Sequence, residues 1–352
     1  MKIRSNYWDN FKGILIFFVV LGHFLYSYRL NVPNSLASNI VTFIYLFHMP
    51  AFIYTTGYLS RSENCYKTKA YLKLFMCFII FNSIMVLFDY LFLNGSLQVV
   101  VPKYSYWYLL STIFWRLLIK PLSNIKGILP VSIIISLLVG FYPDINNTMS
   151  LVRTFAFFPF FILGYKYDLK ELKNKLLNKK IFKIIFPVTL LITGIIIGYI
   201  TLKTNLTSSN YLYYSYKANK DLIIRIVLLL IATLSTFTLA LNTSEKKLPL
   251  ITKAGKYSLL IYLVHRPITI IFNKVFKSVN YSNNYILYSL IGTIIVLIIF
   301  LNTKLNNYFN KFLNYLTENT KRAISIILII LLLLLSVKPV TIMTDKIFNK
   351  KE

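Results

Sequence analysis

The stretch "YWDNFKGILIFFVVLGHF", Tyr7 to Phe24, joins a polar helix start to a long apolar run and places a histidine deep inside that run. Asp9 and Lys12 come first, and His23 follows an unbroken series of apolar residues and glycines. A helix needs about 20 such residues to cross a bilayer. The stretch therefore predicts a membrane-spanning helix over 11–29, and the lack of a small-residue cleavage site predicts that it is retained.

Apolar runs of this kind recur along the chain. Of the 352 residues, 57% are hydrophobic and 14% are charged, whereas ordinary soluble domains have about 25% charged residues. The pattern predicts an all-α, polytopic integral membrane helical bundle with ten transmembrane helices and an eleventh. We expect a membrane domain over 1–303, followed over 304–352 by an amphipathic segment, the eleventh helix and a basic tail. The predicted spans are 11–29, 39–59, 71–93, 105–119, 128–143, 151–167, 182–202, 222–241, 256–276, 284–303 and 323–340.

The basic residues are distributed unevenly between the two sides of this predicted bundle. A net charge of +28 would suggest a nucleic-acid partner in a soluble protein, but here lysine and arginine gather in the loops on the N-terminal side. The positive-inside rule then predicts a multi-pass protein of the cell membrane, with a cytoplasmic N-terminus and with membrane lipids, not nucleic acid, around it. The crowded loops are those near 61–73, 116–126, 166–183, 246–256 and 304–322.

All three histidines, His23, His48 and His265, fall inside predicted spans. At a rise of about 1.5 Å per residue, each lies near the middle third of the hydrocarbon. An ionisable group at this depth is costly and marks a functional site by default. His48 and His265 each precede a proline, and proline-broken helices are tolerated where the backbone lines a cavity. We therefore expect a shared polar pocket. A simple hydrogen bond between helices is the alternative for each histidine, and no ligand spacing suggests a metal site.

Further polar residues in or near the predicted spans are candidates for substrate binding. Lys12 and His23 share one face of the first helix, about three turns apart, which suits a long anionic substrate lying along that face. Asp89 is the one acid well inside a predicted span, where it can pair with a histidine, bind a sugar hydroxyl or lie in the headgroup region. Arg153, near the outer end of its span, can bind an acidic sugar or lipid phosphate, or extend to the membrane surface.

Five motifs follow one another across the first nine predicted spans. They are "DNFKGILIFFVVLGH" (9–23), "FHMPAFIYTTGYL" (47–59), "YWYLLSTIFWRLL" (106–118), "RTFAFFPFFILGY" (153–165) and "GKYSLLIYLVHRP" (255–267). Each motif is weak alone, but their order and spacing are specific. Together they resemble the membrane-bound acyltransferase-3 family, in particular its fucose 4-O-acetylase-like branch.

The resemblance implies an enzyme that moves an acetyl group from cytoplasmic acetyl-coenzyme A to a hydroxyl of a capsule, another exopolysaccharide or a lipid-linked glycan. The coenzyme is the acyl donor, and no bound cofactor is implied. His23 matches the family's essential first-helix histidine, and Lys12 matches a basic position associated with the coenzyme. The family's RxxR pair at the start of the third span is not reproduced. Lys69 and Lys73 come nearest, but they are one residue too far apart.

Acetyl transfer to a hydroxyl needs a base, donors for the developing oxyanion and cations for the coenzyme's phosphates. Histidine suits the first role, because its unperturbed pKa of about 6.5 lies near working pH. We expect His23 to be the base and His48 and His265 to take part in catalysis. The remaining candidates are Lys12, Arg61, Lys69, Lys73 and Arg116 for the coenzyme, and Asp89, Trp107, Tyr108 and Arg153 for the acceptor.

Two mechanisms and two functions stay open at this point. The acetyl group can pass directly to the acceptor in one mid-membrane cavity, or through a covalent carrier such as a histidine. Export of a lipid-linked or extracellular polysaccharide is the alternative function, because midplane polar groups and proline-broken helices are also typical of transporters. The chain shows no inverted repeat, and the arrangement of Lys12 and His23 has no obvious role in transport, which favours transfer.

Overall fold

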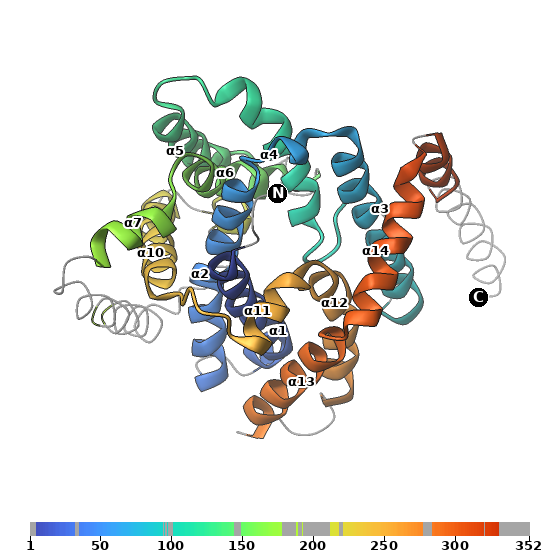
Figure 1. Cartoon of the computed structure of the whole chain (residues 1–352). Helices are drawn as coiled ribbons and strands as arrows, with labels where there is room; N and C mark the ends of the chain where they lie inside the picture. Colours follow the sequence, from blue (N-terminus) through green and yellow to red (C-terminus); the bar gives the residue numbers. More distant parts are fainter. Residues whose placement is uncertain are drawn as a thin grey trace, which may run out of the picture.

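The computed structural model describes residues 5–31, 35–93, 95, 97, 101–143, 149–177, 188, 192, 212–217, 221–276, 284–319 and 321–330. All regular elements in these ranges are helices, which confirms the all-α class (Figure 1). The elements are α1 (Asn6–Asn31), α2 (Leu36–Leu59), η1 (Glu63–Tyr66), α3 (Thr68–Leu93), α4 (Trp107–Leu122), α5 (Ile128–Leu138), η2 (Val139–Phe141), α6 (Leu151–Lys166), α7 (Leu169–Leu177), α10 (Asp221–Asn242), α11 (Pro249–Lys256), α12 (Ser258–Phe276), α13 (Asn284–Phe300) and α14 (Thr303–Glu318).

Five helices of the described part are long and apolar enough to cross a membrane, namely α1, α2, α3, α10 and α12. Helices α13 and α14 make a sixth candidate if they are taken together across the 65° bend between them. Helices α4, α5 and α6 coincide with predicted spans, but they have only 16, 11 and 16 residues. Ten spans and an eleventh are therefore not confirmed. The predicted span 182–202 lies almost entirely outside the described residues, and 323–340 is described only as far as residue 330.

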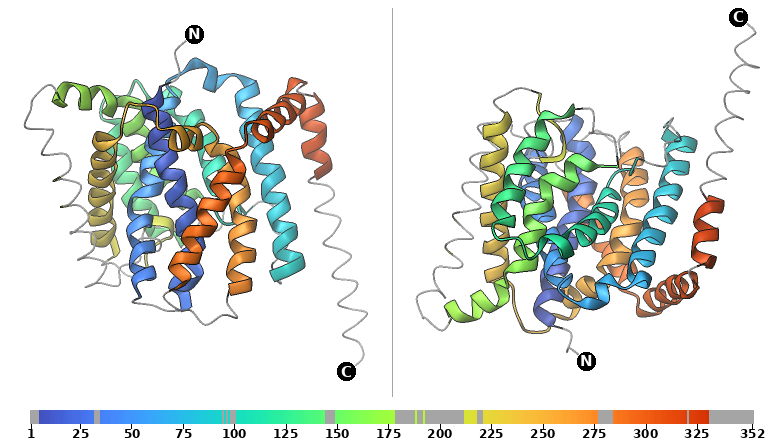
Figure 2. Two further views of the ribbon diagram at one scale, coloured as in Figure 1. Left: turned by 60° about the horizontal axis from the view of Figure 1, so that its bottom comes forward. Right: turned by 90° about the horizontal axis from the view of Figure 1, so that it is seen from above.

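Helix α1 is central to the packing. It contacts α2, α11, α12 and α13, and its residues Tyr7, Phe11, Leu15 and Ile16 are fully buried. In Figure 2 the long helices run side by side, and the short helices α7, α11 and α14 lie at the end of the bundle where α1 begins. These short helices carry many of the lysines, so the charge is concentrated at one end, as the predicted topology requires. That this end faces the cytoplasm stays a prediction.

Glycines allow two close helix crossings at that same end. Between α2 and α6, a Cβ on Gly57 or on Gly164 would lie 2.0 or 1.8 Å from a carbonyl oxygen of the facing helix. Between α1 and α11, a Cβ on Gly13 or Gly255 would likewise lie 2.0 or 1.7 Å from a facing carbonyl oxygen. Small residues let membrane helices approach backbone to backbone in this way. The glycines therefore fix α2 against α6 and α11 against α1, and α11 leads directly into α12.

Candidate active site

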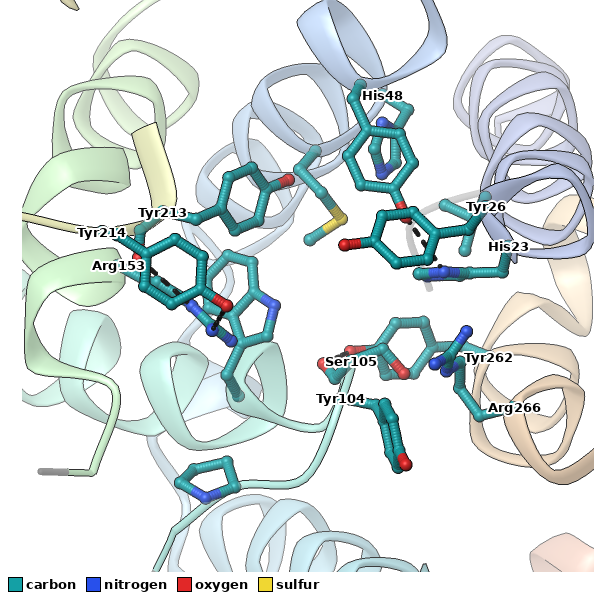
Figure 3. Close-up of a pocket in the computed structure, with 15 residues that line it drawn as sticks. His23, Tyr26, His48, Tyr104, Ser105, Arg153, Tyr213, Tyr214, Tyr262 and Arg266 are labelled. Carbon is teal, nitrogen blue, oxygen red and sulfur yellow. Dashed lines mark hydrogen bonds between the residues drawn. The ribbon is translucent and has the colours of Figure 1, made fainter. Parts of the chain in front are cut away.

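A cavity of about 250 Å³ lies between α1, α2, α12 and the segments that precede α4 and α10 (Figure 3). His23 of α1 and His48 of α2 line it, and Arg266 lines it from α12. Much of the remaining wall is aromatic, with tyrosines and Trp107. We refer to it as the histidine cavity. This cavity corresponds to the polar pocket expected from the sequence, and two of the three predicted histidines, His23 and His48, line it.

His23 is the histidine that is only half-buried, and its ring is oriented by Tyr45. Its Nδ1 lies 3.1 Å from the Tyr45 hydroxyl, which comes from α2. Its backbone carbonyl accepts a hydrogen bond from the Asn273 side chain at 3.3 Å. When Nδ1 donates its proton to Tyr45, the neutral ring carries its lone pair on Nε2. This arrangement leaves Nε2 able to accept a proton.

His48 and His265 are fully buried and hydrogen-bonded to their own helices. Nδ1 of His48 donates to the Ile44 carbonyl at 2.7 Å, and Nδ1 of His265 donates to the Tyr262 carbonyl at 2.8 Å. A carbonyl can only accept, so in each neutral ring Nε2 is the acceptor. Nε2 of His265 is buried and has no hydrogen-bond partner within the described part. The His265 and His23 rings stack with their centroids 5.2 Å apart, so both belong to one polar cluster.

The segment before α4 forms another wall of the histidine cavity and is fixed to α3 and α12. The Tyr262 hydroxyl donates to the Ser105 carbonyl. Tyr104 has a φ of 48°, in the left-handed region that large side chains rarely adopt. Its hydroxyl donates to an Asp89 carboxylate oxygen at 2.6 Å. Burial and this hydrogen bond raise the pKa of the Tyr104 hydroxyl, which keeps it protonated as a donor.

The proline after the third histidine has a specific structural consequence. Pro267 lies inside α12, so the carbonyl of Leu263 lacks its usual helical partner. The Tyr106 hydroxyl donates to this carbonyl at 2.7 Å. The carbonyl freed beside His265 therefore fixes the wall of the cavity, and the buried acceptor is satisfied.

A second cavity, of about 290 Å³, lies toward the opposite end of α1. Lys12 of α1 and Arg116 of α4 line it, and we call it the Lys12 cavity. Lys12 makes an ion pair with Asp9 at 3.1 Å, and Nε of Arg116 donates to the Ser60 hydroxyl at 3.1 Å. Lys12 and His23, which the helical periodicity places on one face, thus line two different cavities.

Two tyrosine rings form the wall between these cavities. Tyr262 lines both of them, and the ring of Tyr108, which lines the Lys12 cavity, packs against it with centroids 5.4 Å apart. The Thr56 hydroxyl donates to the Phe52 carbonyl, so Tyr108 is the donor in its own short hydrogen bond with Thr56. Both rings are therefore held in place by their hydroxyl groups.

The other predicted coenzyme cations lie outside the Lys12 cavity. Arg61 donates to the carbonyls of Tyr165 and Gly164 at 2.6 and 3.0 Å, so it caps the end of α6. Lys69 is exposed on α3, and Lys73 is half-buried one turn later. Neither is among the residues that line the cavity. Of the five predicted cations, the structure therefore brings together Lys12 and Arg116.

The predicted acceptor residues are divided between the cavities. Trp107 and Arg153 line the histidine cavity, whereas Tyr108 lines the Lys12 cavity. Asp89 lines neither. Its carboxylate makes an ion pair with Lys103 at 2.7 Å in addition to the hydrogen bond from Tyr104. None of the three roles considered for Asp89 included these partners, and its contacts support the cavity wall.

Comparison with known proteins identifies the family of this chain. The sequence pattern of the acyltransferase domain matches residues 5–301, which include both cavities. The chain belongs to the acyltransferase-3 family. It is also similar to the "Nodulation protein NolL" of Sinorhizobium fredii (strain NBRC 101917 / NGR234), with 31% identity over 197 residues. That alignment covers 49% of this chain and 52% of the relative, so the chain spans about half the length of the curated relative it matches. No solved structure matches the chain.

The structure of this member of the acyltransferase-3 family also shows site residues that the sequence prediction missed. Tyr45 and Tyr262 contact or adjoin the histidines, but nothing in the sequence separates them from the other tyrosines, of which there are 27 in all. Arg266 carried a usable signal, because it is an ionisable residue inside a predicted span and stands within the motif "LVHRP". Its side chain lines the histidine cavity beside His23 (Figure 3).

Proposed function

We propose that this membrane acyltransferase moves an acetyl group from acetyl-coenzyme A to a hydroxyl of a cell-surface carbohydrate, with His23 as general base. The observation that carries the proposal is the pair of cavities on either side of Tyr262, one with cations and one with histidines. The resemblance to the fucose 4-O-acetylase-like branch favours acetyl as the acyl group. A capsule or another exopolysaccharide is the acceptor we expect, at the cell membrane with the N-terminus in the cytoplasm.

In this proposal the donor binds in the Lys12 cavity. Coenzyme A carries phosphates, and Lys12 and Arg116 are the cations that line this cavity. Charge-assisted hydrogen bonds to phosphate are among the stronger polar contacts that proteins make. The acetyl thioester then lies toward Tyr108 and Tyr262, the wall that borders the histidine cavity. If the hydroxyl groups of these two rings release Thr56 and the Ser105 carbonyl, the rings can move and connect the donor with the acceptor.

His23 performs the proton transfer in the histidine cavity. Nε2 of His23 removes the proton from the acceptor hydroxyl as the hydroxyl oxygen forms a bond to the thioester carbonyl carbon. The carbon–sulfur bond then breaks, and the coenzyme leaves as a thiol after taking up that proton. The hydrogen bond to Tyr45 orients the ring through Nδ1, and in this mechanism the Tyr45 hydroxyl accepts it, so that the lone pair is on Nε2. His265 and His48 complete the polar surroundings, and a positioned base of this kind contributes about 100- to 10,000-fold in rate.

The test compares cell-envelope glycans from strains with the protein, without it and with His23→Ala. We expect mass spectrometry to show glycans that carry one additional acetyl group only when the wild-type protein is present. The amount of membrane protein and of exported glycan should be the same in the His23→Ala strain. Acetylated glycans that persist in that strain, together with a loss of export, would instead support a polysaccharide exporter.

A further inference from the structure

The histidine cavity contains two arginines that lack an acidic partner among the residues that the structure describes. Arg266 is 6% exposed, and its guanidinium lies over the Tyr104 ring at 4.6 Å. Its one hydrogen bond within the described part is long, 3.5 Å to the Thr269 hydroxyl, and its buried Nε has no partner there. Arg153 reaches the cavity from α6 and makes bonds of 3.4 and 3.2 Å to Tyr213 and Tyr214. Figure 3 shows the two guanidinium groups on different sides of the cavity.

Arg225 shows what a structural arginine looks like in the same protein. It is fully buried in α10, and it donates to the carbonyls of Ser136 and Tyr214 at 2.8 and 2.6 Å. Its guanidinium also lies 4.5 Å from the centre of the Tyr216 ring. Buried charges are normally satisfied in this manner, because an unsatisfied one costs several kcal/mol. Arg266 is similarly buried but has no comparable set of acceptors.

The wall of the cavity supplies no negative charge to balance these cations. Among the described residues that line it there is no aspartate or glutamate. The nearby Asp89 already makes an ion pair with Lys103. The Ser105 hydroxyl and the Tyr213 hydroxyl are further buried donors without a partner in the described part. The cavity therefore offers positive charge and hydrogen-bond donors beside the proposed base.

We propose that the acceptor carries an anionic group, a carboxylate or a phosphate, which Arg266 binds in the histidine cavity while a hydroxyl of the same acceptor lies at His23 and Arg153 adds positive charge from the other side of the cavity. This proposal rests on the proposed function, because it takes the bound anion to be part of the acetyl acceptor. Anion binding by the cavity can nevertheless be measured without acetyl transfer. Arginine suits the role because its planar fork matches both carboxylate and phosphate oxygens. The acceptor class is thus an acidic or phosphate-bearing carbohydrate, and a neutral glycan would leave both charges unpaired.

The first experiment measures binding to the purified full chain in detergent at constant ionic strength. The probes are glucuronic acid for the carboxylate, glucose 6-phosphate for the phosphate and methyl glucoside as the neutral counterpart. We expect at least one anionic probe to raise the unfolding temperature and methyl glucoside not to. Arg266→Gln should weaken binding of that probe about 10- to 100-fold. Arg266→Lys should restore part of it.

Arg322→Gln is the matched control for that experiment. Arg322 also lies over a tyrosine ring, that of Tyr315 at 4.5 Å, but it is exposed at the other end of the bundle. We expect Arg322→Gln to bind the anionic probe as the wild type does. A response to glucuronic acid alone identifies a carboxylate, and a response to glucose 6-phosphate alone identifies a phosphate. The proposal fails if neither anion binds better than methyl glucoside, or if Arg266→Gln binds as tightly as Arg322→Gln.

A second measurement separates binding from folding. Without ligand, Arg266→Gln should unfold at the same or a higher temperature than the wild type, because it removes an unpaired buried charge. Arg225→Gln should unfold at a lower temperature, because it removes the hydrogen bonds to the carbonyls of Ser136 and Tyr214, the first of which is buried. Equal losses in the two variants would make Arg266 structural and overturn the proposal. Anion binding without any acetyl transfer in cells would leave this site intact and refute the proposed function instead.

Discussion

The two ends of the bundle, one with the Lys12 cavity and the other with the histidine cavity, are packed by different means. At the Lys12 end, α2 and α6 approach backbone to backbone through Gly57 and Gly164, and α1 and α11 through Gly13 and Gly255. At the histidine end, aromatic rings and arginines occupy the space between the helices. Backbone contacts leave few ways to adjust, whereas side chains can change rotamer. The comparison indicates that the Lys12 end is the more rigid of the two, and under the proposed function the adjustment to different acceptors would take place at the histidine end.

The largest effect that tests this division is expected at His23. His23→Asn should lower acetyl transfer about 100- to 10,000-fold, because the variant keeps a polar side chain but loses the base. Binding of coenzyme A to the purified protein should be unchanged, since the coenzyme is assigned to the other cavity. Transfer is measured by acetyl incorporation into glycans, and binding by the shift in unfolding temperature. A joint loss of both would show that the cavities do not act separately.

The next largest effect is expected at a glycine of the donor end. Gly164→Ala should lower the free energy of unfolding by about 1–3 kcal/mol, because its Cβ would lie 1.8 Å from the Tyr54 carbonyl oxygen and that backbone cannot turn aside. Thermal unfolding in detergent measures the change. Gly292→Ala is the control, because its Cβ would meet the edge of the Phe24 ring at 3.0 Å, and a side chain can yield. Similar losses in both variants would argue against a rigid donor end.

The contrast between the two ends also explains how far the sequence could predict this molecule. Long apolar runs located α1, α2, α3, α10 and α12 to within a few residues, because membrane hydrocarbon demands continuous apolar helices. The three short helices at the donor end include α7 and α11, which no prediction named, because a short amphipathic helix has no comparable length requirement. The break between α13 and α14 falls at the end of the predicted span 284–303, where Asn302 caps α14, but the angle of 65° between the two helices cannot be read from periodicity.

The same reasoning applies to the candidate site. The histidines were predictable because an ionisable side chain in an apolar span is conspicuous. The sequence could not predict which cations line a cavity and which do not, because Arg61, Lys69, Lys73 and Lys12 all stand near the same predicted membrane surface. Only the packing shows that Arg61 caps α6 while Lys12 lines a cavity. Arg266 stands between a histidine and a proline that already mark the motif, so the sequence alone does not assign it a separate role.

A smaller effect is expected from the cations of the Lys12 cavity. Lys12→Gln and Arg116→Gln should each raise the KM for acetyl-coenzyme A about tenfold, which corresponds to about 1.4 kcal/mol of lost phosphate binding. The kcat at saturating donor should change little. Steady-state transfer in membrane vesicles with varied donor concentration measures both constants. Lys170→Gln is the control, because Lys170 also makes an ion pair, at 3.2 Å with Glu245, but lies outside the cavity. A fall in kcat alone would assign Lys12 and Arg116 to the chemical step.

The smallest effect is expected from Lys69 and Lys73, the residues nearest to the family's basic pair. Both lie on α3 outside the lining of the Lys12 cavity, although Leu74 of the same helix does line it. Substitutions at such positions usually change a free energy by about 0.5 kcal/mol or less, so Lys69→Gln and Lys73→Gln should alter the KM for acetyl-coenzyme A about twofold or less. The same vesicle assay measures them beside Lys12→Gln. A tenfold rise for either lysine would mean that the bound coenzyme extends past the cavity mouth along α3, and the donor site would then include the surface of α3 as well as the cavity.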